Sequence, residues 1–138
     1  MKLKPLSNPS IDFLFSLFGF AFLIRLIYLF DLAGNPLFDT FPEAVDHWNF
    51  DKGAISFSQG DWLARAQNNA FSPLYKYFLG VLYWVSSRNF YFIYGVQFFL
   101  GAVSSVLIYL IGRHLFSPLA GLFAFIGFSL FSTQIIYE

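Results

Sequence analysis

Carboxylates gather in one short stretch of an otherwise apolar chain. The sequence has 138 residues, is 57% hydrophobic and contains eight Asp and Glu residues. Four of these eight lie in residues 41–62, FPEAVDHWNFDKGAISFSQGDW, and they are Glu43, Asp46, Asp51 and Asp61. A carboxylate can act as a general base or as a metal ligand. This stretch is therefore where the sequence predicts a catalytic or metal-binding site.

The same stretch has the pattern of a surface helix. Thr40 and Glu43 have the spacing of a capping box, which predicts a helix over about 41–59 that ends at Gly60. An apolar face of that helix is formed by Val45, Trp48 and Ile55. Such an amphipathic helix is suited to lying on a membrane.

Asp46 is the carboxylate of most interest in this helix. Together with Phe50 and Ala54 it forms a stripe with a spacing of four, directly beside the apolar face. We expect the Asp46 carboxylate to be partly desolvated there, which would make it a better base. The alternative is a solvated surface acid. That alternative suffices for Glu43, because early helical positions favour negative charge.

The composition predicts that the elements holding these residues are in lipid. Only 12% of the residues are charged, about half the usual share, and the mean hydropathy is +0.60. The formal net charge is zero, so nothing indicates nucleic acid binding. The chain has no Cys, which excludes disulfides, thiolate metal sites and a cysteine nucleophile.

Three apolar runs are long enough to cross a bilayer, which takes about 20 residues. They are residues 11–30, 90–111 and 118–137. Asn89 is placed to cap the second run, and Ser117 followed by a proline opens the third. A cleaved signal peptide is the alternative for the first run, but its apolar core would be only about 7–15 residues long.

The segment 73–85 is too short to cross and predicts a helix in the membrane interface, although a fourth crossing there is an alternative. With three crossings, Lys2, Lys4 and Arg113 are all cytoplasmic, as the positive-inside rule requires. The N-terminus is then cytoplasmic, and the loop 31–89 is extracytoplasmic.

Some residues within the apolar runs invite a structural interpretation. We expect Arg25 to snorkel toward the far end of the first crossing. His114 is expected to lie in the short cytoplasmic loop after the second crossing, without a role in a site. Four small residues are expected to let helices pack closely, and they are Gly101, Ser105, Gly121 and Ala124. The predicted fold class is an all-α integral membrane protein with three transmembrane helices and amphipathic membrane-lying helices in its first loop.

The order of several short motifs resembles the N-terminal portion of GT-C superfamily membrane glycosyltransferases. The motifs are DHWNF (46–50), GDWL (60–63), SPLY (72–75), YGVQ (94–97) and QIIYE (134–138). The branches most similar are the protein O-mannosyltransferases and the aminoarabinose transferases of lipid A. The resemblance covers nearly the whole chain from about residue 11 and rests on the order and spacing of the motifs.

This resemblance implies transfer of a sugar from a polyprenyl-phosphate donor to a hydroxyl of a protein, lipid or glycan, at the outer face of a bacterial or archaeal plasma membrane. It implies that Asp46 is the catalytic base. Phe50 stands where relatives usually have Tyr, and Glu138 stands where many have an acid. The aminoarabinose transferases place a Lys just before a Pro in this loop, whereas here Ser72 precedes Pro73.

A cation is needed to hold the donor phosphate. Lys76 is the first candidate, followed by Arg65 and Arg88, and each could instead be an interfacial anchor. A divalent metal is possible because some GT-C relatives bind one. His47 and Asp51 are weak candidate ligands, since no metal-binding motif accompanies them.

The length of the chain opens a second reading. GT-C enzymes have several hundred residues and many more crossings, so we expect these 138 residues to be an N-terminal piece that is inactive alone. The alternative is a complete small membrane protein that acts as a non-catalytic subunit or assembly partner. A transporter fragment is disfavoured, because the crossings hold few polar residues that could line a path.

Overall fold

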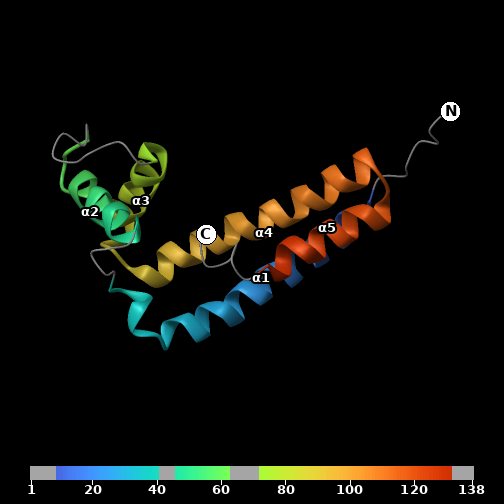
Figure 1. The fold of residues 1–138 in the computed structure, drawn as a ribbon, viewed down its shortest axis with the longest axis horizontal. Helices are drawn as coiled ribbons and strands as arrows, with labels where there is room; N and C mark the ends of the chain where they lie inside the picture. Colours follow the sequence, from blue (N-terminus) through green and yellow to red (C-terminus); the bar gives the residue numbers. More distant parts are fainter. Residues whose placement is uncertain (1–8, 41–45, 63–71, 132–138) are drawn as a thin grey trace. The chain divides into compact units, whose positions relative to one another are not determined.

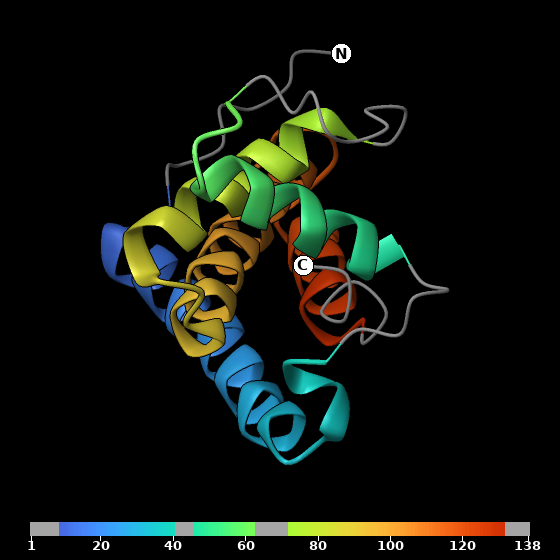
Figure 2. The same cartoon turned by 90° about the vertical axis from the view of Figure 1, so that its left-hand side faces the viewer.

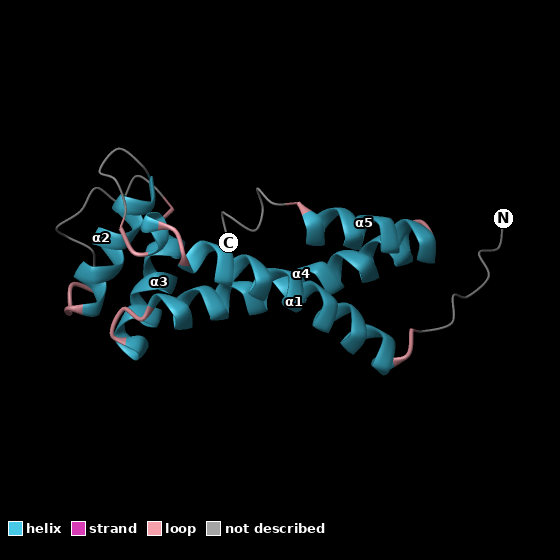
Figure 3. Ribbon diagram, turned by 90° about the horizontal axis from the view of Figure 1, so that it is seen from below, coloured by secondary structure: helices cyan, strands magenta, loops and turns pink. Residues whose placement is uncertain are grey.

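The structure is a computed structural model that describes residues 9–40, 46–62 and 72–131, and every regular element in these ranges is helical (Figures 1 and 3). The elements are α1 (Ile11–Ala33), the 3₁₀ helix η1 (Pro36–Phe38), α2 (Asp46–Ser58), α3 (Pro73–Ser86), α4 (Phe90–Leu115) and α5 (Pro118–Leu130). The all-α prediction is therefore confirmed for the described residues.

The chain divides into two compact units. One, which we call the bundle unit, contains Met1–Asp31 and Val96–Glu138; the other, the loop unit, contains Leu32–Gly95. The division falls inside α1 and α4, near the end of the former and the start of the latter. The loop unit corresponds closely to the loop that the sequence predicts over 31–89.

The bundle unit packs α1, α4 and α5 around an apolar core. Its buried residues are Leu17, Ala21, Ala102, Tyr109 and Phe125. Edge-to-face ring contacts join α1 to α4, with centroids 5.5 Å apart for Phe13 and Tyr109 and 5.4 Å apart for Phe18 and Phe99. These contacts bury large apolar rings, which are the main source of packing energy in such a core.

Small residues bring α4 and α5 close together. A Cβ atom added to Gly121 would lie 2.5 Å from the Tyr109 carbonyl oxygen, and one added to Gly112 would lie 2.9 Å from the Gly121 Cα. Gly101 and Ser105 are buried, as the packing prediction requires, whereas Ala124 is exposed. The close approach is thus confirmed for Gly121, the burial of Gly101 and Ser105 agrees with the prediction, and the prediction is wrong for Ala124.

Arg25 does not snorkel, so that prediction is wrong. The side chain is fully buried at 0% exposure. Its Nη1 donates to the Ala21 carbonyl oxygen at 3.3 Å, and its guanidinium carbon lies 5.9 Å from the centroid of the Phe128 ring. The guanidinium therefore points back along α1 and packs against α5, instead of extending toward the end of the helix.

Two of the predicted crossings coincide with long apolar helices. α1 and α4 have 23 and 26 residues and are the two described helices long and apolar enough to cross a bilayer, judged by length and composition. Each begins at the predicted residue and runs three or four residues beyond the predicted end. The third predicted crossing, 118–137, is described only as far as the 13-residue α5, and residues 132–138 lie outside the described ranges.

The predicted helix signals have clear structural counterparts. Asn89 accepts a hydrogen bond from the Phe92 N–H at 3.2 Å, and Ser117 accepts one from the Ala120 N–H at 3.1 Å. Ser72 precedes α3 as predicted, but its side chain makes no capping bond. The Thr40 hydroxyl donates to the Pro36 carbonyl oxygen. The predicted capping-box partner, Glu43, lies outside the described residues.

Gly60 ends α2 as predicted. Its φ of 104° is in the left-handed region that favours glycine. The Gly60 N–H donates to Phe57 at 3.0 Å, and the Asp61 N–H donates to Ser56 at 3.1 Å. This pair of bonds is a Schellman motif, which satisfies carbonyl groups at the helix end.

Candidate functional site

α2 and α3 lie side by side in the loop unit (Figure 2). The ring of Phe50 meets that of Tyr75 edge to face at 5.0 Å, and the ring of Phe57 meets that of Tyr77 at 5.4 Å. Ala54 is fully buried between these aromatic contacts. The face of α2 that packs on α3 is thus the stripe with Phe50 and Ala54, next to the face that the sequence predicts to lie on a membrane.

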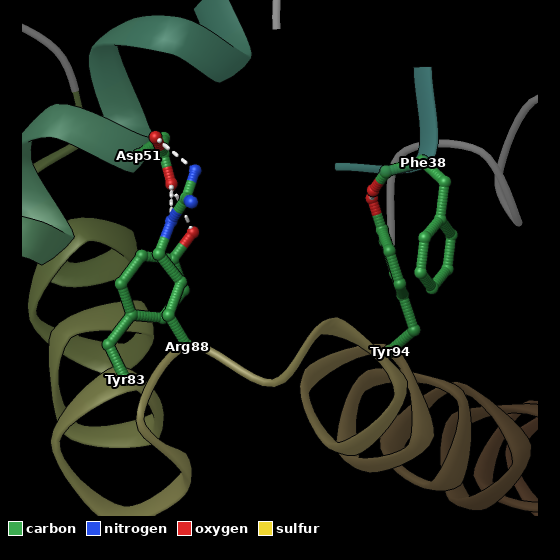
Figure 4. Close-up of polar contacts among 5 residues, drawn as sticks. All are labelled: Phe38, Asp51, Tyr83, Arg88 and Tyr94. Carbon is green, nitrogen blue, oxygen red and sulfur yellow. Dashed lines mark hydrogen bonds and ion pairs between the residues drawn. The ribbon is translucent and has the colours of Figure 1, made fainter. Parts of the chain in front are cut away.

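Asp51 is the polar residue of this packed face. Its side chain is 11% exposed. Its Oδ1 accepts a hydrogen bond from the Tyr83 hydroxyl at 2.6 Å and another from the Arg88 Nε at 3.1 Å, while its Oδ2 accepts one from the Arg88 Nη2 at 2.9 Å (Figure 4). The two arginine bonds form a bidentate pair, the stronger geometry for an arginine and a carboxylate. We call Asp51, Tyr83 and Arg88 the carboxylate clamp.

The backbone around Arg88 is unusual. Ser87 and Arg88 have φ values of 52° and 62°, in the left-handed region that residues other than glycine rarely adopt. The N–H of each of these residues donates to the Tyr83 carbonyl oxygen, which ends α3. Such strained residues persist where the surroundings hold them. Here the side chain of Arg88 is held by the carboxylate clamp.

An aromatic ring outside the clamp contacts its arginine, whose side chain is 40% exposed. The guanidinium carbon of Arg88 lies 4.8 Å from the centroid of Phe90, the first residue of α4. Burial raises the pKa of Tyr83, and the hydrogen bond to Asp51 raises it further, because an ionised phenolate there would face a carboxylate. Tyr83 therefore stays a neutral hydrogen-bond donor across the physiological pH range.

Asp46, the predicted base, is the first residue of α2. Its side chain is exposed, and its oxygens make no hydrogen bond or ion pair with any residue that the structure describes. The expected partial desolvation is therefore not found. Asp46 belongs to the stripe of Phe50 and Ala54 that packs on α3, but it is the first residue of α2 and its side chain is exposed.

The basic residues that were predicted to bind the donor phosphate have different surroundings. Lys76 is buried on α3, with only 4% exposure. Arg88 is ion-paired with Asp51, so its positive charge already has a carboxylate partner. Arg65 lies outside the described residues, and so does the predicted acid Glu138. The structure thus gives Lys76 and Arg88 distinct settings and does not bring either of them to Asp46 by any described contact.

The weak metal prediction gains no support within the described ranges. His47 and Asp51 lie on α2, but no group of three His, Cys, Asp or Glu residues that could hold a metal is found among the described residues. Both Asp51 oxygens already accept hydrogen bonds. A metal at Asp51 would lie beside the positively charged guanidinium of Arg88, which opposes the binding of a cation.

Sequence reasoning missed the role of Tyr83 and treated Asp51 and Arg88 as separate candidates. One pattern in the sequence could have indicated that Asp51 needs a partner. Asp51 precedes Ala54 by three residues and therefore shares its face on a helix. A carboxylate on a packed face requires a partner, and a cation just beyond the neighbouring helix is the nearest choice.

Comparison of the chain with protein-family models, with curated proteins and with solved structures returned no match. The resemblance to the GT-C superfamily consequently rests on the motifs quoted above.

Proposed function

We propose that the chain is an integral membrane protein that carries part of a sugar-transfer site. The apolar helices α1 and α4 support the membrane setting, because only 22% and 33% of their most apolar windows are buried. The core helix of a soluble protein would be mostly buried. Here large apolar side chains are exposed along both helices, and examples are Phe15 (67%), Ile27 (63%), Phe30 (77%) and Leu107 (51%).

The exposed face of α3 supports an interfacial position for this helix. Lys76, Leu79 and Tyr83 are buried on one side. The opposite side carries a stripe of exposed apolar residues, and they are Leu74, Val81, Trp84 and Val85. α4 begins only four residues after α3 ends, so a bilayer crossed by α4 would meet α3 at its surface.

Within this setting the proposed activity is inverting transfer of a sugar from a polyprenyl-phosphate donor to an acceptor hydroxyl. Asp46 takes the proton of the hydroxyl while the hydroxyl oxygen attacks the anomeric carbon. The bond from that carbon to the phosphate oxygen breaks, and the lipid phosphate leaves with the electron pair. Because the leaving group is a phosphate, the second carboxylic acid used in glycoside hydrolysis is not required.

One observation carries the assignment of the base. α2 holds two carboxylates, of which Asp51 is hydrogen-bonded by Tyr83 and Arg88, while Asp46 is exposed and accepts no such bond from the described residues. Asp46 is thus the accessible proton acceptor on α2. Lys76 and Arg65 stay the proposed ligands of the donor phosphate on the strength of the sequence motifs, although Lys76 is buried in the chain; Arg88 is ion-paired with Asp51.

The test compares Asp46→Asn with Asp39→Asn in the native-length protein in its own membranes. Asp39 is also an exposed acid of the loop unit, so it is the matched control. Transfer of labelled sugar from lipid-phosphate donors extracted from those membranes should fall about 100-fold or more in Asp46→Asn and stay unchanged in Asp39→Asn.

Equal transfer by wild type and Asp46→Asn would remove Asp46 from the mechanism. Absence of transfer in the wild type, together with co-purification of the chain with a larger membrane protein, would instead favour the non-catalytic subunit. The intact mass of the native polypeptide distinguishes a piece of a longer enzyme from a 15.8 kDa protein.

A further inference from the structure

We propose that the carboxylate clamp positions Asp46 by fixing α2 to the corner between α3 and α4. Asp51, Tyr83 and Arg88 act as positioning residues, an inference that rests on the proposed function of Asp46. The helix α2 has only 13 residues. A helix of that length is marginal in water, so its order depends on what it packs against.

The apolar contact between α2 and α3 combines two ring pairs with small residues. Gly53 and Ala54, which have little or no side chain, are the fully buried apolar positions of α2. Gly80 of α3 lies so close to Phe57 that an added Cβ would be 2.5 Å from its ring. The Phe50 and Phe57 rings are only partly buried, and the small residues bury little apolar area, so the three hydrogen bonds to Asp51 supply the directional part of the contact.

The clamp joins three segments that are separate in the sequence. Asp51 lies in the middle of α2, Tyr83 in the last turn of α3, and Arg88 in the link to α4 (Figure 4). Phe90, which stacks on the guanidinium at 4.8 Å, begins α4. A bidentate ion pair fixes orientation as well as distance, because a planar guanidinium must face the carboxylate.

The position of Asp46 depends on the tilt of α2 about this clamp. Asp46 precedes Asp51 by five residues, which corresponds to about 7.5 Å along the helix axis. A tilt of roughly 10° about Asp51 would move position 46 by about 1.3 Å, and a misplacement of about 1 Å can lower a rate 100-fold. A structural clamp can therefore control the rate without touching the substrate.

The experiment measures hydrogen–deuterium exchange of the α2 amides and kinetics of sugar transfer on the same native-length protein in lipid nanodiscs. Arg88→Ala should raise the α2 exchange rates about tenfold or more, because it removes both arginine bonds and leaves Asp51 poorly paired. It should also lower kcat, with little change in the KM of the donor. Arg88→Lys should restore part of both losses, since Lys keeps the charge but not the bidentate geometry.

Arg113→Ala is the matched control. Arg113 also donates to a tyrosine hydroxyl, that of Tyr109 at 3.0 Å, but it belongs to the bundle unit. It should leave α2 exchange unchanged. If Arg88→Ala does not fold, Tyr83→Phe is the second variant, because it removes one hydrogen bond to Asp51 while keeping the ring.

The outcomes separate the two proposals. If Asp46→Asn abolishes transfer and the clamp variants change neither α2 exchange nor kcat, the positioning role is overturned and the proposed function stands. Faster exchange with an unchanged kcat also overturns that role. If Asp46→Asn transfers sugar normally, the proposed function falls and the positioning role falls with it, whatever the exchange rates are.

Discussion

The bundle unit and the loop unit share ring contacts and close approaches at glycine residues, but the loop unit adds a carboxylate held by an arginine and a tyrosine. In the bundle unit, α4 and α5 approach at Gly112 and Gly121, where an added Cβ would meet backbone atoms of the other helix. In the loop unit, α2 is joined to α3 by ring contacts and by the hydrogen bond from Tyr83 to Asp51, and the ion pair between Asp51 and Arg88 joins α2 to the link before α4. Lipid provides no hydrophobic force between helices, so close backbone packing is what a membrane segment needs.

The difference between the helix contacts of the two units therefore agrees with the surroundings proposed for each unit. Residues in a bilayer pack by shape, whereas residues at its surface can use charge and hydrogen bonds. Arg25 is the exception in the bundle unit, and it is fully buried there.

Gly121→Leu should have the largest effect. Its Cβ alone would lie 2.5 Å from the Tyr109 carbonyl oxygen and 2.7 Å from the Arg113 nitrogen, so the backbones of α4 and α5 must separate. We expect a loss of about 3 kcal/mol in the free energy of unfolding, measured by denaturant titration in detergent micelles. Gly127→Ala is the control on the same helix, because nothing lies within 4 Å of its added Cβ. Equal stability of the two variants would remove close packing as the basis of the bundle unit.

Gly80→Ala should destabilise the loop unit by less, about 1 to 2 kcal/mol. Here the added Cβ meets the side chain of Phe57, at 2.5 Å from its ring and 2.8 Å from its Cβ, and a side chain can move more easily than a backbone. In a Phe57→Ala background the ring contacts are gone, so part of the loss should disappear. Additive losses in the double variant would contradict a direct clash.

The alkaline stability of the loop unit should depend on Tyr83. The pKa of Tyr83 is raised in the folded chain above the ordinary value of about 10, because burial and the bond to Asp51 disfavour the phenolate. The folded state then holds the proton more tightly than the unfolded state. The resulting stability is fully present below about pH 10 and is lost as the pH rises from there toward the folded pKa.

The measurement is the difference between wild type and Tyr83→Phe in unfolding free energy from pH 9 to pH 11. Above about pH 10, wild type should lose up to about 1.4 kcal/mol more per pH unit than the variant, which is the limit for one proton. Parallel curves would show that Tyr83 ionises as easily in the folded chain as in the unfolded one.

Lys52→Ala should have the smallest effect. The Lys52 ammonium lies 3.6 Å from the centroid of the Trp48 ring, a cation–π contact on the exposed side of α2. At an exposed site such a contact contributes about 0.5 to 1 kcal/mol. Denaturant unfolding followed by tryptophan fluorescence should detect a loss in this range. A loss as large as that of Arg88→Ala would mean that exposed charges matter as much as the clamp.

Local patterns predicted the helices well. Helix starts at Ile11, Phe90 and Pro118 follow from apolar length and capping residues, and Gly60 marks the end of α2. Those signals act within a few residues of the chain. The C-terminal ends of helices that pack in the bundle unit were less well predicted. For example, α4 runs to Leu115, whereas the prediction ended at residue 111.

Side-chain partners across long sequence distances were not predicted. Asp51 and Arg88 are 37 residues apart, and their pairing depends on how α2 turns its faces toward α3. The sequence favoured the face of Trp48 and Ile55, because apolar residues there suit a membrane, while the contact with α3 selects small residues such as Ala54. Arg25 was misjudged for a similar reason, since its neighbour Phe128 comes from a distant helix.

The burial of Arg25 has a consequence for how the chain is made. Phe128, which packs on its guanidinium, is synthesised 128 − 25 = 103 residues later. At about 5–20 residues per second, a ribosome takes roughly 5 to 20 s to reach it. During that interval α1 would enter the bilayer with a charge in its apolar run, at an insertion penalty of about 3 kcal/mol. If α1 crosses a bilayer as proposed, its apolar run must keep it inserted until α5 has been made.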